Sequence, residues 1–109
     1  MRISIKDNFH LNGVVSTLGS RSFTALYDPQ TITNEVVCIL LDKGTIIVGK
    51  TAMGAYAGSE VPLEKNIDYF ASWNPRGGGY QGPSGSSSGA GSSAFGYPWV
   101  DFALRTDSK

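Results

Sequence analysis

Apolar and polar residues alternate at the start of the chain. In RISIK, residues 2–6, Ile3 and Ile5 fall on one face, which is the pattern of a short β-strand. A second apolar run, at residues 46–48, is continuous and predicts a buried strand. The first half of the chain therefore contains two candidate strands.

Between these strands, TITNEVVCILLDKG at residues 31–44 reads as a helix. Thr33 or Asn34 can cap its start, and Gly44 is a natural stop. We expect the thiol of Cys38 to be buried on the apolar side of this helix. The apolar residues that form one broad face are Val36, Val37, Ile39, Leu40 and Leu41.

The second half carries a weaker periodic signal. Residues 51–58 are compatible with a short helix, and residues 74–89 read as a loop because Gly, Pro and Ser dominate them. Small residues at 90–96 can start a helix against a close neighbour. Alternation within residues 99–107 predicts another strand. The succession of strand, loop, helix and strand indicates the α/β class.

Composition narrows the function classes. The 109 residues suffice for one domain with a modest core. Lys plus Arg equal Asp plus Glu at nine each, with no basic cluster, so nucleic acid and anionic membranes are not expected partners. No apolar stretch approaches the roughly 18 residues of a membrane helix. The N-terminus lacks an apolar signal core, so we expect a cytoplasmic location.

Cys38 is the single cysteine and His10 the single histidine. One cysteine cannot form a disulfide within the chain, and one histidine without a neighbouring ligand cluster gives no metal site. No cofactor is expected. The oligomeric state stays open.

The stretch GPSGSSSGAGSS, residues 82–93, has the composition of a flexible linker. However, only sixteen residues follow Ser93, which leaves no second domain for a linker to connect. Glycine lets backbone N–H groups approach a ligand closely, and long glycine-rich loops in compact domains are often functional. An active-site loop and a plain loop both remain open on this reasoning.

Several stretches, read together, resemble the amidase signature family. ISIKDNFHLNGVVSTLGS, residues 3–20, has the form Val/Ile-Lys-Asp-Asn, then Gly-Val and Thr-x-Gly-Ser. IIVGKTAM, residues 46–53, is similar to the Gly-Lys-Thr-Asn-Met strand end. WNP, a glycine-rich run and then residues 86–108 resemble the signature stretch: Asn-Pro, a gap, Gly-Gly-Ser-Ser-Gly-Gly, small residues and Leu-Gly-Thr-Asp. The specific feature is their joint order along nearly the whole chain.

The resemblance implies an α/β fold, namely part of a mixed sheet covered by helices. Residues 1–109 would form a partial amidase signature domain, truncated at both ends. The family hydrolyses or transfers amide carbon–nitrogen bonds through a Ser-Ser-Lys triad. A small-molecule amide is therefore the expected substrate of the full-length parent.

The resemblance also implies site residues. Lys50 matches the catalytic lysine, and Ser87 matches the bridging serine, whose peptide bond is cis in the family. Ser88 is expected to be a supporting hydrogen-bond donor, and Thr106 and Asp107 match the strand end before the oxyanion loop. A lysine acts as a base near neutral pH only when burial or nearby cations keep it unprotonated. Lys50 ends an apolar run, so its stem can be buried.

Other residues near these motifs are open to simpler interpretations. Lys6 and Asp7 are expected to form a buried structural pair near the site. Trp73, Tyr80 and Tyr97 can line a substrate channel, although packing is the simpler role. The Gly-Lys-Thr sequence lacks the upstream glycine of a phosphate-binding loop, which argues against nucleotide binding.

The sequence departs from the family in several places. The nucleophilic serine would lie four residues after Asp107, beyond Lys109, and Ser108 has the wrong offset. We therefore expect the chain to be inactive by itself. The alternative is a non-catalytic truncated member that acts by association with another chain. Three departures are milder. Ala52 stands where the family has asparagine, and Ala90 and Arg105 stand where it has glycine.

Overall fold

The structure is a computed structural model that describes residues 1–58, 66, 68–79, 81–83 and 85–107. The elements within these residues, in chain order, are β1 (Arg2–Lys6), α1 (Arg21–Leu26), α2 (Glu35–Asp42), β2 (Ile46–Thr51), the 3₁₀ turn η1 (Ala55–Ala57), α3 (Ser88–Gly96) and β3 (Phe102–Leu104). Within this part of the chain, no helix has the length and apolar character needed to cross a bilayer.

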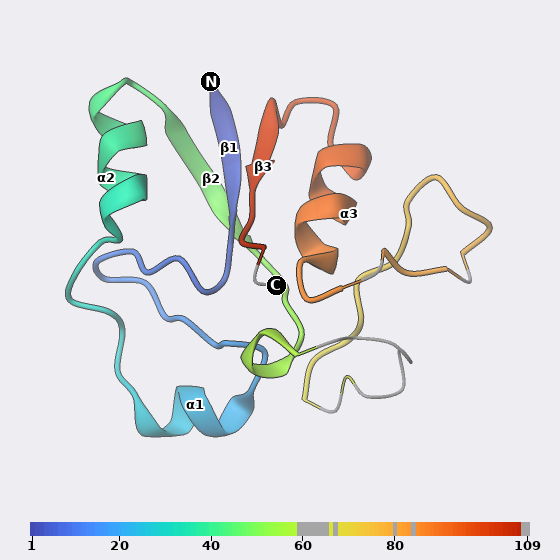
Figure 1. The fold of residues 1–109 in the computed structure, drawn as a ribbon, viewed down its shortest axis with the longest axis horizontal. Helices are drawn as coiled ribbons and strands as arrows, with labels where there is room; N and C mark the ends of the chain where they lie inside the picture. The colour runs from blue at the N-terminus through green and yellow to red at the C-terminus, as the bar shows by residue number, and fades with distance from the viewer. Residues whose placement is uncertain (59–65, 67, 80, 84, 108–109) are drawn as a thin grey trace.

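The three strands form one parallel sheet in the order β2-β1-β3 (Figure 1). Ile3 of the central strand pairs with Ile47 on one side and Phe102 on the other. Parallel neighbours need a long crossover, and the segment from residue 7 to residue 45, which contains α1 and α2, provides the first one. The predicted α/β class and all three predicted strands are confirmed.

The two faces of β1 carry different chemistry. Side chains alternate across a strand, so Ile3 and Ile5 share one face and Ser4 and Lys6 share the other. Ile3 and Ile5 are fully buried in an apolar core with Val37 of α2. On the opposite face, Ser4 Oγ lies 2.8 Å from Ser93 Oγ of α3. The sheet is thus covered by α2 on an apolar side and by α3 on a polar side.

Helix α2 begins where the sequence predicts. Asn34, one of the two candidate caps, accepts a hydrogen bond through its side chain from the Val36 N–H at 3.0 Å. Gly44 has φ +80°, a left-handed conformation that a glycine adopts without strain. The prediction of a buried Cys38 is wrong, because only Val37 of this helix is buried and Cys38 is exposed. Only a narrow part of the broad apolar face of α2 is therefore buried, and the rest is exposed or half-buried.

Two helical segments depart from the expected boundaries. The sequence does not predict helix α1, which has no buried residue and no side-chain cap and so carries no amphipathic signal. Helix α3 begins at Ser88, inside the stretch that reads as loop. Glycine and serine disfavour helix by intrinsic propensity, and tertiary contacts of α3 with all three strands override that preference.

Candidate active site

Lys6 is the last residue of the central strand and is only 1% exposed. Its Nζ donates to Ser87 Oγ at 2.8 Å, Ser86 Oγ at 2.9 Å and Thr106 Oγ1 at 3.0 Å. These hydroxyls come from the turn before α3 and from the segment after β3. A buried lysine amine therefore meets three hydroxyl groups at the carboxyl end of the sheet, where ligands of open α/β sheets commonly bind.

The serine turn, which contains Ser86 and Ser87, is held against the end of β2 by backbone contacts. Gly89 N–H donates to Ala52 O at 3.1 Å, and Gly54 N–H donates to Ser86 O at 3.2 Å. A Cβ at Gly89 would collide with the backbone of Ala52. Glycine is therefore required at this position for the close approach that places Ser86 and Ser87 over Lys6.

Thr106 closes the site from the third strand. Its carbonyl oxygen accepts the Ser87 hydroxyl at 3.1 Å, and its Oγ1 accepts Asn8 Nδ2 at 3.2 Å as well as Lys6. Asp107, the next predicted residue, is exposed. Thr106 thus joins the cluster, whereas the Asp107 side chain faces solvent.

Lys50 occupies the opposite side of the sheet. Its Nζ lies 3.0 Å from Asp7 Oδ1 and donates to Ser16 Oγ at 2.6 Å and Val15 O at 3.4 Å. A bulge in β2 shifts the register, so that Lys50 pairs with Ile5. Register partners share a face, and the face of Ile5 is the α2 face.

The structure therefore brings Lys6, and not the predicted Lys50, to Ser87. The sequence contains a partial signal for this position of Lys6, because alternation in residues 2–6 places Lys6 on the face opposite Ile3 and Ile5. The position of Lys50 depends on the bulge, which alternation alone does not reveal. Lys6 and Asp7 are both buried, and Asp7 forms an ion pair with Lys50.

Asp7 organises the α2 side of the site. Its Oδ2 accepts hydrogen bonds from Thr17 N at 2.7 Å, Thr17 Oγ1 at 2.8 Å and Leu18 N at 2.6 Å. The His10 ring contacts Ser16 Oγ at 2.8 Å. The Lys-Asp-Asn motif thus reaches the serine turn through Lys6 and the Thr-x-Gly-Ser loop through Asp7.

Ser88, predicted to support the site, is fully buried at the first turn of α3. Its Oγ has no hydrogen-bond partner among the described residues, and neither does Asn8 Oδ1. A buried polar atom without a partner costs free energy unless another group meets it. A supporting role for Ser88 therefore stays a prediction.

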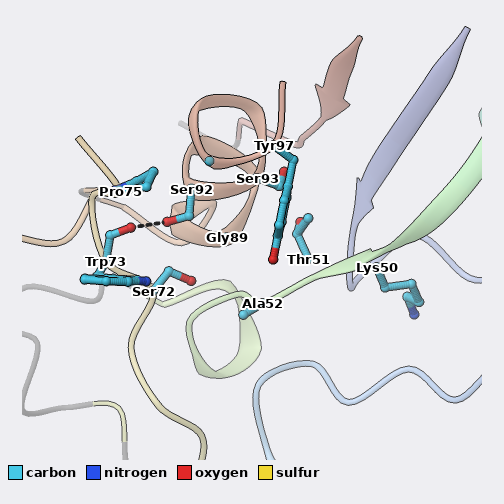
Figure 2. A pocket seen from close by; sticks show the side chains of 11 residues that line it. Lys50, Thr51, Ala52, Ser72, Trp73, Pro75, Gly89, Ser92, Ser93 and Tyr97 are labelled. Atoms are coloured by element: carbon cyan, nitrogen blue, oxygen red, sulfur yellow. Dashed lines mark hydrogen bonds between the residues drawn. The ribbon is translucent and has the colours of Figure 1, made fainter. Parts of the chain in front are cut away.

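An open hollow of about 410 Å³ lies beside the serine turn, between α3, the end of β2 and residues 72–75 (Figure 2). Trp73 and Tyr97 line it, and Ser92 Oγ donates to Trp73 O at 2.5 Å. Gly89, two residues after Ser87, also lines the hollow. Tyr80 falls outside the described residues.

Two of the sequence departures are accommodated by the surroundings. Arg105 is exposed, so its charge is solvated and does not crowd the sheet, and Ala90 is buried in α3.

In the part of the chain that the structure describes, His, Cys, Asp and Glu form no group of three able to hold a metal ion.

Comparison with known proteins points to one family. The model of the family described as Amidase matches residues 1–108. A mitochondrial glutamyl-tRNA(Gln) amidotransferase subunit of Ixodes scapularis is 43% identical over 54 residues, which cover 50% of this chain and 10% of that protein. The matched part thus spans about a tenth of this relative's length. No solved structure matches the chain.

Proposed function

Because the chain belongs to the amidase family, we propose that residues 1–109 supply the lysine and the bridging serine of a site that cleaves amide carbon–nitrogen bonds. The observation that carries this proposal is the 2.8 Å contact between the buried Lys6 Nζ and Ser87 Oγ. We propose Lys6 in the role that the resemblance gave to Lys50, because the Lys50 ammonium is engaged by Asp7 on the other face.

The chemistry follows from the two groups. Burial removes water from an ammonium group and so favours the neutral amine, which can act as a general base. The Ser87 hydroxyl both donates and accepts, so once its O–H turns from Thr106 O to Lys6 it can pass a proton to Lys6 while taking one from an attacking hydroxyl. The attacking oxygen bonds to the amide carbon, the carbon–nitrogen bond breaks, and the relayed proton leaves with the amine.

The attacking serine is expected from outside the sequence, four positions beyond Asp107. We therefore propose that residues 1–109 alone do not turn over amides, because loss of the nucleophile leaves only residual catalysis. The alternative is a non-catalytic family member that acts by association.

We propose a small-molecule amide as substrate, supported by the hollow beside the serine turn. Transfer of the amide nitrogen, which the name of the Ixodes scapularis relative describes for that protein, is the competing outcome.

The test compares two lysines in one chimera. Residues 1–108 replace the segment of the Ixodes scapularis relative that aligns to the same part of the amidase family model, and ammonia release from a primary amide is measured. Lys6→Met should lower the rate by about 10²–10⁴-fold, the contribution of a positioned general base. Lys50→Met should retain most activity per folded molecule. A chimera that depends on Lys50 and tolerates Lys6→Met would overturn the assignment.

A further inference from the structure

Lys6 contacts two consecutive serines. Ser86 Oγ lies 2.9 Å from Lys6 Nζ, nearly as close as Ser87 Oγ at 2.8 Å. Ser86 stands where the Gly-Gly-Ser-Ser-Gly-Gly form of the family has its second glycine, so the second hydroxyl is a feature of this chain. The Ser86 backbone is fixed, because its carbonyl accepts the Gly54 N–H at 3.2 Å.

The two hydroxyl protons are used differently. Ser87 donates its proton to Thr106 O at 3.1 Å. For Ser86, the described residues offer Lys6 Nζ as the polar side-chain contact and no carbonyl acceptor. When Lys6 is neutral, its lone pair can therefore receive the Ser86 proton without breaking the bond of Ser87 to Thr106.

Solvent exposure also favours Ser86 over Lys6 as the residue that reacts with an electrophile from solvent. Lys6 is 1% exposed, whereas Ser86 is partly exposed on the turn before α3. Ser86 is therefore the more accessible of the two residues to a reagent from solvent. A hydroxyl beside a neutral amine base is the arrangement of a serine–lysine nucleophile.

We propose that Ser86 is a nucleophile that Lys6 activates toward acyl and phosphonyl electrophiles. This inference rests on the proposed role of Lys6 as a base. With an alkyl fluorophosphonate, Ser86 Oγ forms a bond to phosphorus and the phosphorus–fluorine bond breaks. Fluoride leaves with the bonding electron pair, and the serine proton moves to Lys6 Nζ. The product is one stable covalent adduct, which requires no second catalytic serine.

The experiment labels the 109-residue chain with an alkyl fluorophosphonate, follows intact mass over time and maps the modified residue. The expected result is one adduct, on Ser86, that Ser86→Gly and Ser86→Ala abolish. Ser22→Ala, which removes a hydroxyl of helix α1 that contacts Ser20 Oγ, is the matched control and should label at the original rate. Lys6→Met should slow labelling by about 10²-fold or more. Lys6→Arg, which keeps the charge, should slow it equally, and circular dichroism verifies that each variant is folded.

The outcomes separate the two proposals. A lysine-dependent adduct on Ser87 would overturn the role of Ser86 and leave the proposed role of Lys6 and Ser87 standing. An adduct on Ser86 that forms equally fast in folded Lys6→Met would overturn activation by Lys6, and with it the role of Lys6 as a base. Absence of any adduct from the folded chain would overturn the inference about Ser86 alone.

Discussion

Lys6 Nζ lies 2.8 Å from Ser87 Oγ, although 81 positions separate the two residues in the chain. The contact exists because three motifs converge on the carboxyl end of one parallel sheet. Strand β1 presents Lys6, the end of β2 receives the backbone of Gly89, and the segment after β3 provides Thr106. The candidate site therefore depends on tertiary contacts, and substitutions at those contacts test it.

Gly89→Ala should destabilise the chain by about 1–3 kcal/mol, because the added methyl group meets the backbone of Ala52. Gly91→Ala is the matched control in the same helix. Its Cβ would make only ordinary contact with Pro83, so it should be neutral or stabilise by about 0.5–1 kcal/mol. Urea unfolding measures both variants. Equal effects would mean that α3 does not dock on β2 through Gly89.

Lys50→Met should cost about 3–5 kcal/mol, because it leaves the carboxylate of Asp7 buried without its cation. The two side chains are 11% and 8% exposed. The control is Arg2→Gln at the exposed pair with Asp101, where the loss should stay below about 1 kcal/mol. Thermal and urea unfolding report both. A Lys50→Met loss as small as that of Arg2→Gln would contradict a buried structural pair.

Asn34→Ala should lower stability by about 1 kcal/mol, because it removes the side-chain acceptor for the Val36 N–H. Asn34→Asp keeps an acceptor oxygen and should be close to neutral. Chemical denaturation distinguishes the two. If Asn34→Asp were as costly as Asn34→Ala, the cap would not be the reason for the loss.

How far the sequence predicts this arrangement depends on the element. Alternation at Ile3 and Ile5 and the cap at Asn34 are local signals, and they correctly predict β1 and α2. The exposure of Cys38 cannot be read locally, because burial depends on which residues of α2 meet the sheet. Helix α1 escapes prediction for a similar reason: it buries no side chain and so leaves no periodic pattern.

The choice between Lys6 and Lys50 shows the same limit at the site. Both lysines follow apolar strands in family-like motifs, so composition and motif order treat them alike. The bulge between the pairs of Ile3 and Ser4 decides which face Lys50 occupies. A bulge is a property of strand pairing, and it flips every later side chain to the other face.

The Tyr56 hydroxyl, in the 3₁₀ turn η1, provides a test by pH titration. Hydrogen bonds of the Tyr56 hydroxyl with Ser22 and then Ser20 lower its pKa below 10.0, while desolvation and the Asp68 carboxylate act in the opposite direction. A lowered pKa means that the folded chain releases this proton first, so stability rises as the pH rises between the folded and unfolded values. Ser22→Ala should raise the pKa of Tyr56. Phenolate absorbance measures the shift, with Tyr56→Phe identifying the signal. An unchanged titration would contradict the contact.

The central claim, that Lys6 rather than Lys50 serves the serine turn, is tested most directly by two double-mutant cycles. Unfolding free energies are measured for Lys6→Met, Lys50→Met and Ser87→Ala, and for each lysine change combined with Ser87→Ala. The 2.8 Å contact predicts a coupling of about 1–3 kcal/mol between Lys6 and Ser87. Lys50 and Ser87 should be additive within about 0.5 kcal/mol. Strong coupling of Ser87 to Lys50, together with additivity toward Lys6, would contradict the account.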